Sequence, residues 1–240
     1  MPNEHVEWIM HGLSESDPRC LRSPAELSAY IDKVGFLPLF KNQVSGFSVE
    51  ELTAPDYWWS GDEKRDPWEW RAIIAREGKI AYGKFFERKA GFISPKWLPR
   101  FINYRRDGYD FDALWDDGKV KYAKKRIMDL FADSAELFSY EMKQKAGFGK
   151  DGEKNFDGLT TELQMQTYLV NADFRCRLNK AGIPYGWAIA VFTTPEQRWG
   201  AELVASAYRE APERSWTAII DHAAALYPQA DKKQLEKLLK

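Results

Sequence analysis

Residues 67–94, PWEWRAIIAREGKIAYGKFFERKAGFIS, encode a helix and a hairpin in direct succession. After Pro67, apolar residues such as Trp68 and Ala75 recur at helical spacing, and Gly78 ends the helix. The segments 79–86 and 90–94 then follow as the two strands of a predicted hairpin. This stretch therefore supplies the last helix and the hairpin of a unit whose other elements precede it.

The residues before this stretch predict two further helices and a short strand. Ser23, Pro24 and Glu26 form a capping-box pattern at the start of a helix that Gly35 ends. A short apolar strand is predicted at 36–40, and Ser48 with a glutamate three residues later caps a second, short helix. The predicted order is therefore helix, strand, helix, helix, hairpin.

The same order recurs further along the chain. An amphipathic helix is predicted at 120–132, a short strand at 137–138 and a helix at 140–146 that Ser139 caps. Thr161 and Gln164 show capping-box spacing at the start of a helix that is predicted to run to about Asp173. The strands of a second hairpin are predicted at 174–178 and 185–192. Recurrence of the whole unit supports the assignment more strongly than any single element.

Helix, strand, helix, helix and hairpin is the order of a winged helix-turn-helix unit, whose third helix is placed to enter a nucleic-acid groove. We therefore predict an α+β protein with two winged-helix units in tandem and additional C-terminal helices. The predicted segments are a leader (1–22), a first unit (23–108), an acidic linker (109–118), a second unit (119–195) and C-terminal helices that pack on the second unit (196–240).

The aspartates of the linker allow a second interpretation. Asp110, Asp112, Asp116 and Asp117 could act as an acid–base pair or hold a hard cation. Their alternation with aromatic residues before a glycine is more typical of a connection that ends in a turn.

Composition excludes several classes of protein. The chain has 240 residues, 44% of them hydrophobic, which is enough for one large or two small cores. Its two cysteines, Cys20 and Cys176, form no disulfide framework, and His5, His11 and His222 lack metal-ligand spacing, so we expect neither a metal nor another cofactor. No apolar run approaches the roughly 18 residues of a membrane span. A cytoplasmic protein is expected, whereas the sequence does not indicate its oligomeric state.

Charge is unevenly distributed along the chain. Residues 1–63 hold 4 Lys/Arg against 11 Asp/Glu, whereas residues 64–108 hold 12 against 5, a net charge of +7. Such a basic block interleaved with aromatic residues suits a groove that follows a phosphate backbone. The alternative is an ordinary hairpin face, whose cations keep an edge strand soluble. The candidate phosphate contacts are Lys84, Arg88, Lys89, Lys96, Arg100, Arg105 and Arg106.

The stretch from Trp58 to Arg100 also resembles a known family. It contains Trp58-Trp59, the helix with Trp68, the strand Gly78-Lys79-Ile80-Ala81, a basic hairpin and the exit Trp97-Leu98-Pro99. This arrangement is similar to that of the AlkZ/YcaQ-type winged-helix DNA glycosylases. The resemblance implies tandem winged helices, duplex DNA as the partner and the removal of alkylated bases by a Gln-x-Gln or Gln-x-Asp motif.

The chain contains one candidate for that motif, Gln164-Met165-Gln166. A pair of amides could position a water and stabilise the sugar cation as the base leaves. In the family, however, the motif lies ahead of the Trp-rich segment, whereas here it follows it. Alternatively, Gln164 closes the capping box with Thr161 and Gln166 is a solvated helix residue.

Aromatic residues provide the last candidates. Trp58, Trp59 and Tyr82 could stack on an extruded base, although clustered tryptophans more often fill a core. The leading hypothesis is a DNA-interacting protein related to alkylated-base glycosylases, with its activity undecided. A non-catalytic module that binds DNA or a protein through the third helix of the second unit is the second hypothesis. A small-molecule pocket lined by the tryptophans is the third.

Overall fold

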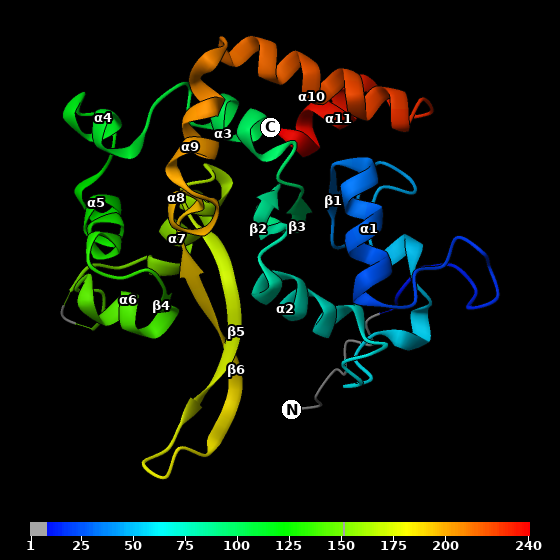
Figure 1. The fold of residues 1–240 in the computed structure, drawn as a ribbon, viewed down its shortest axis with the longest axis horizontal. Coiled ribbons are helices and arrows are strands. Elements are labelled where there is room, and N and C mark those ends of the chain that lie inside the picture. Colours follow the sequence, from blue (N-terminus) through cyan, green and yellow to red (C-terminus); the bar gives the residue numbers. More distant parts are fainter. Residues whose placement is uncertain (1–8, 151) are drawn as a thin grey trace, which may run out of the picture.

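Two sets of elements follow the same order along the chain (Figure 1). The structure is a computed structural model that describes residues 9–150 and 152–240. The first set comprises α1 (Pro24–Val34), β1 (Phe36–Pro38), the short 3₁₀ helices η1 (Glu50–Leu52) and η2 (Pro55–Tyr57), α2 (Pro67–Glu77), β2 (Ala81–Phe86) and β3 (Lys89–Ile93). The second set comprises α5 (Tyr122–Met128), the 3₁₀ helix η3 (Asp129–Ala132), β4 (Leu137–Phe138), α6 (Ser139–Lys145), α7 (Phe156–Met165), β5 (Val170–Leu178) and β6 (Pro184–Thr193).

Each set forms a small antiparallel sheet of three strands, in the orders β1-β3-β2 and β4-β6-β5. In the first sheet Phe36 and Ala81 both lie opposite Ile93, and in the second sheet Leu137 lies opposite Phe192. The predicted mixture of helices and short antiparallel strands is therefore confirmed. The two sheets share one topology, with the short strand beside the last strand of the hairpin.

Local signals set the ends of the first helices. The Ser23 Oγ accepts a hydrogen bond from the Glu26 N–H at 3.2 Å, which caps α1 as the sequence predicts. Asp66 caps α2 in the same way, since its Oδ1 accepts from the Trp68 N–H at 2.9 Å. Gly78 ends α2 with a φ of 69°, a left-handed conformation that favours glycine.

Two segments differ from the prediction. The predicted helix 161–173 is instead α7, and β5 begins at Val170. Thr161 does not cap this helix, because it lies inside the helix and its Oγ1 donates to the Asp157 carbonyl at 2.7 Å. The linker contains a short helix, α4 (Phe111–Asp116), which forms because the Asp110 carboxylate accepts from the Ala113 N–H at 2.8 Å.

The C-terminal residues form α8 (Pro195–Trp199), α9 (Ala201–Ala205), the 3₁₀ helix η4 (Ser206–Arg209), α10 (Pro212–Leu226) and α11 (Lys232–Leu239). In the described part of the chain, no helix has the length and apolar character needed to cross a membrane. We expected these helices to pack on the second unit, but α10 and α11 complete the first hydrophobic core. Ile219, Ile220 and Ala223 of α10 pack beside α3 (Leu98–Arg105), a helix that the sequence analysis did not predict.

Two hydrophobic cores are present, one for each sheet. The first surrounds Phe36, whose ring lies 5.0 Å from that of Phe101 and 5.6 Å from that of Trp97. The second surrounds Leu163 of α7 and Phe192 of β6. Both cores thus lie between a sheet and its helices, as expected for a layered α and β arrangement.

Part of the predicted leader packs on this framework. Residues 1–8, which include His5, lie outside the described residues. From residue 9 onward the chain contacts the first core region, where the His11 N–H donates to Glu50 Oε1 at 3.2 Å. The Arg22 guanidinium donates to the carbonyls of Glu15, Asp17 and Cys20, which ties residues 15–22 together.

A glycine between α1 and β1 provides a test of the first core. Gly35 has a φ of 90°, and a Cβ at this position would lie 2.5 Å from the Trp97 indole. Gly46 has a similar φ of 78° but open space around it. We predict that Gly35→Ala lowers the free energy of unfolding by about 1–3 kcal/mol more than Gly46→Ala does, because only the first adds steric overlap to backbone strain. Chemical denaturation of the two variants measures this difference, and equal losses would contradict the packing of Trp97 on Gly35.

Candidate nucleic-acid interface

Two of the predicted phosphate contacts, Arg106 and Arg105, instead bind groups of the protein itself. Arg106 is 2% exposed, and its Nη1 donates to Glu196 Oε1 at 2.6 Å while its Nη2 donates to the Thr167 carbonyl at 2.8 Å. Its guanidinium lies 4.3 Å from the centre of the Tyr168 ring. Arg106 therefore joins α3, α8 and the end of α7, and a DNA phosphate cannot reach it.

Arg105 also forms hydrogen bonds within the protein. Its Nη2 donates to the carbonyls of Phe85 at 2.7 Å and Leu239 at 3.1 Å, which links β2 to α11. The guanidinium lies 4.8 Å from the centre of the Phe101 ring. Burial lowers the pKa of Arg105, because the charged form loses its hydration.

The remaining predicted cations do not form one track. Lys84, Arg88 and Lys89 lie at or near the turn between β2 and β3, whereas Lys96 follows the opposite end of β3. β3 begins at Lys89 and ends at Ile93, three residues before Lys96. Arg100 lies with Lys96 and forms a 3.7 Å ion pair with Glu210. The structure thus places these cations at both ends of β3, and a shared phosphate-binding role for them stays a prediction.

The two candidate catalytic glutamines have separate partners. Gln164 is 2% exposed, and its Oε1 accepts from the Lys84 N–H at 3.0 Å while its Nε2 donates to the Thr160 carbonyl at 3.2 Å. Gln166 ends α7, and its Oε1 accepts from Lys124 Nζ at 3.0 Å. Their amide groups thus address different elements and do not face a common cleft.

The three predicted stacking residues have different environments. Trp58 is buried, and its Nε1 donates to the Thr53 hydroxyl at 2.9 Å. Tyr82 is also buried, which raises the pKa of its hydroxyl to about 12. Trp59 is 46% exposed, so it is the member of this group that could meet a ligand.

Each hairpin covers a helix of the other set. Against β2, α7 is held by the Gln164 contact, by the 3.3 Å bond from Lys84 Nζ to the Thr161 hydroxyl and by the Arg88 N–H, which donates to the Met165 sulfur at 3.3 Å. Against β5, α2 is held by the 3.1 Å ion pair of Arg76 with Asp173.

This mutual cover also buries charge. The Arg71 side chain of α2 is enclosed between Trp68, on the same helix, and Phe174 of β5. As a result, most of α7 and the side of α2 that carries Arg71 are covered, whereas Arg76 and Glu77 at the end of α2 stay exposed.

The hairpin of β5 and β6 is the most exposed structure in the described residues. It is longer than the first hairpin and extends away from the helices, as Figure 1 shows for the yellow strands. Trp187 is 92% exposed, which is unusual for a tryptophan. Other large apolar residues lie near it, and those that are mainly exposed are Leu178, Ile183 and Tyr185.

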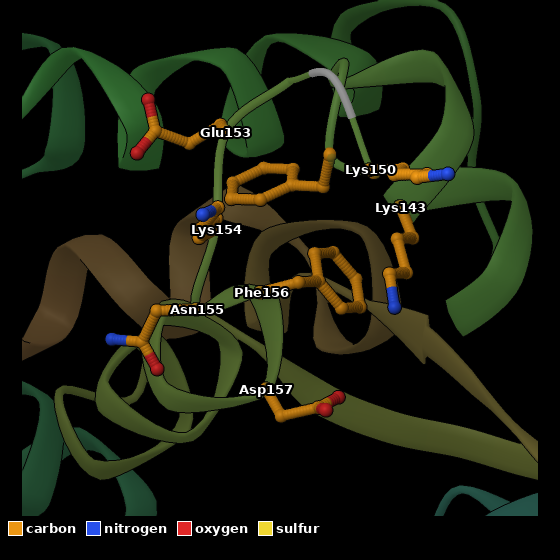
Figure 2. Close-up of a pocket in the computed structure, with 9 residues that line it drawn as sticks. Lys143, Lys150, Glu153, Lys154, Asn155, Phe156 and Asp157 are labelled. Carbon is orange, nitrogen blue, oxygen red and sulfur yellow. The ribbon is translucent and has the colours of Figure 1, made fainter.

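Cations lie beside this hairpin. The Arg177 guanidinium of β5 is 4.3 Å from the centre of the Tyr140 ring on α6, and Lys143 follows one helical turn later. Lys143 also lines a cavity of ≈ 350 Å³ with Lys150 and Lys154. Figure 2 shows Phe156 between Lys143 and Asp157 in this cavity, whose other acid is Glu153. The hairpin thus combines exposed aromatic residues with a flank of mainly positive charge.

The sequence analysis predicted this hairpin but did not identify it as a candidate binding site. The net charge of the basic block drew attention to residues 64–108, where part of the charge is buried. A usable signal was the spacing of Tyr185, Trp187 and Ile189, which alternate in a strand whose partner carries Arg175 and Arg177. An apolar face opposite cations on a long hairpin is less typical of a core strand than of a binding surface.

Comparison with known proteins establishes the family. A family model described as "AlkZ related" matches residues 21–240, and the chain belongs to this family. The resemblance inferred from Trp58 to Arg100 is thereby confirmed. No curated protein sequence matches the chain. Among solved structures, the Streptomyces sahachiroi DNA glycosylase AlkZ is similar, with a TM-score of 0.46, 11% sequence identity and coverage of 92% of this chain. The match covers 60% of the glycosylase chain.

The burial of Arg106 leads to a test. We predict that Arg106→Ala lowers the free energy of unfolding by about 3–5 kcal/mol, because it removes one partner of a buried ion pair and a support of the Thr167 carbonyl. The exposed Lys96→Ala variant removes the same charge and should leave stability nearly unchanged. Equilibrium denaturation of both proteins measures the losses. Similar stability of the two variants would contradict a structural role for Arg106.

Proposed function

We propose that this protein is a DNA-binding protein built from two winged-helix units, residues 23–108 and 119–195. The repeated element order and the shared topology of the two sheets support this division. Residues 109–118 connect the units, and residues 196–240 stabilise the first unit through α10 and α11. Membership of the AlkZ-related family supports a role related to DNA repair.

The observation that carries the proposal is the exposed hairpin of β5 and β6. Trp187 is almost fully exposed, and Arg177 and Lys180 lie on the same hairpin. Cations at this position can contact phosphates, and an aromatic side chain can insert between bases or stack on them. Hence the second hairpin, rather than either third helix, is the proposed contact with duplex DNA.

We further propose that Gln164 and Gln166 do not form a catalytic site. Both polar ends of the Gln164 side chain are already bonded to backbone groups. The segment ahead of Trp58, where the family carries its motif, contains a single glutamine, Gln43, and its Nε2 donates to the Gln234 carbonyl at 3.3 Å. These contacts favour the non-catalytic alternative over hydrolysis of a glycosidic bond.

DNA binding can be measured by fluorescence anisotropy of a labelled duplex between about 50 and 200 mM salt, where phosphate contacts dominate the salt dependence. We predict that the wild-type affinity falls steeply with salt and that Arg177→Gln with Lys180→Gln reduces the slope by about 2, as two phosphate contacts would. Trp187→Ala should weaken binding about tenfold at every salt concentration, because a stacking contact is insensitive to ions.

The matched control is Lys89→Gln with Lys96→Gln, which removes the same charge from exposed positions of the first unit. We expect it to leave the slope close to that of the wild type. If the control reduces affinity and the hairpin variants do not, DNA binds at the first hairpin and the proposal is wrong.

The role of Gln164 has its own test. Gln164→Ala leaves the N–H of Lys84 without its acceptor and opens a gap where a buried side chain was, so we predict a loss of about 1–3 kcal/mol in stability. Affinity for duplex DNA should be unchanged at a temperature where the variant is folded. Release of an alkylated base by the wild type that Gln164→Ala abolishes would establish the catalytic alternative.

A further inference from the structure

Four side chains in contact form a column from the surface of the first unit to the second hairpin. The ring of Trp59 lies 4.9 Å from that of Trp68, and the Arg71 guanidinium lies 3.7 Å from the centre of the Trp68 ring. The same guanidinium lies 4.1 Å from the centre of the Phe174 ring on β5. The outer member, Trp59, is the one whose ring is substantially exposed.

The backbone holds Trp59 in an unusual conformation. Its φ is 63°, which is rare for a bulky residue and raises the local energy by about 1–2 kcal/mol. Two contacts fix the following turn, because the Ser60 hydroxyl donates to the Tyr57 carbonyl at 2.9 Å and the Gly61 N–H donates to Asp66 Oδ2 at 3.1 Å. The ring is therefore positioned before any ligand arrives, and strain of this kind often accompanies a binding site.

The inner cation is buried against aromatic rings. Arg71 is 8% exposed, and its Nε and Nη1 are enclosed without a hydrogen-bond partner in the described structure. Burial lowers the pKa of Arg71, which reflects the cost of keeping this charge out of water. A buried cation between aromatic rings makes the surroundings favourable for an electron-rich, anionic ligand.

We propose that Trp59 is the stacking platform for one unpaired base of the DNA that the second hairpin binds. The proposal rests on the proposed function and names the form of DNA that this site takes. Phe174 belongs to the same strand as Arg177, so the column joins the platform directly to the hairpin.

An unpaired base fits this platform better than a paired one. Bases inside a duplex have both faces covered by their neighbours, whereas a bulged nucleotide can leave the stack at a small cost. A single exposed ring offers one face, which is sufficient to hold one base without reading its sequence. The expected ligand is thus a duplex with an extrahelical nucleotide of any base type.

The test compares two labelled duplexes that differ by one bulged nucleotide. We expect the wild type to bind the bulged duplex about tenfold more tightly than the fully paired one, as one stacking contact provides. Trp59→Ala should abolish this preference while it leaves the affinity for the paired duplex unchanged. Trp59→Phe, which keeps an aromatic ring, should retain most of the preference.

Tyr122→Ala is the matched control, since Tyr122 is a 65% exposed aromatic residue on α5, outside the column. It should retain the full preference. Equal affinity of the wild type for both duplexes overturns the platform but not DNA binding, and Trp59 would then be assigned to a contact with a protein. Failure to bind either duplex overturns the proposed function and the platform together.

Discussion

The side chain of Gln164 bridges the backbones of α7 and β2, and the architecture depends on this kind of cross-contact. An amide enclosed between two segments of the backbone must satisfy its donor and its acceptor. It therefore fixes the distance and the orientation of the elements that it joins. The ion pair of Arg76 with Asp173 has the corresponding position between α2 and β5. Each of these two helices therefore has one face packed against the hairpin of the other set.

Buried arginines reinforce the same arrangement. Arg106 connects α3 with α8 and α7, and Arg105 connects β2 with α11. A guanidinium can do this because it has five donors in a fixed plane and an apolar face that packs on aromatic rings. The basic block of the sequence therefore contributes partly to the interior, whereas Arg177 and Lys180 of the second hairpin are exposed beside exposed aromatic residues.

Local patterns predicted more of the fold than of the site. The cap at Ser23, the end of α2 at Gly78 and both hairpins depend on residues close in sequence, and the pattern could reveal them. The start of α7 was misplaced, because the spacing of Thr161 and Gln164 fits a cap equally well when both residues lie inside a helix. The partner of Gln164 is 80 residues away, so no local rule could show that this amide is structural.

Local sequence patterns were also insufficient to predict which residues of the candidate site are accessible. Trp58 and Trp59 are neighbours of one residue type, yet one is buried and the other is exposed by a left-handed backbone. The resemblance of residues 58–100 indicated the correct family, and the charge distribution indicated a basic region. The choice between buried and accessible cations required the packing of α10 and α11 on α3. That packing joins residues more than 100 positions apart, as in the 3.0 Å bond from Asn103 to the Ser215 hydroxyl.

The most direct test of this account is hydrogen–deuterium exchange of the whole chain with and without duplex DNA. The exposed hairpin should exchange rapidly when free, and DNA should protect the amides of residues 177–188 together with those of α6. Exchange in α2 and α7 should stay slow and unchanged, because the opposite hairpins already cover both helices. Unchanged exchange in the second hairpin, with altered exchange in α2 or α7, would show that DNA reaches a third helix and would contradict the central claim.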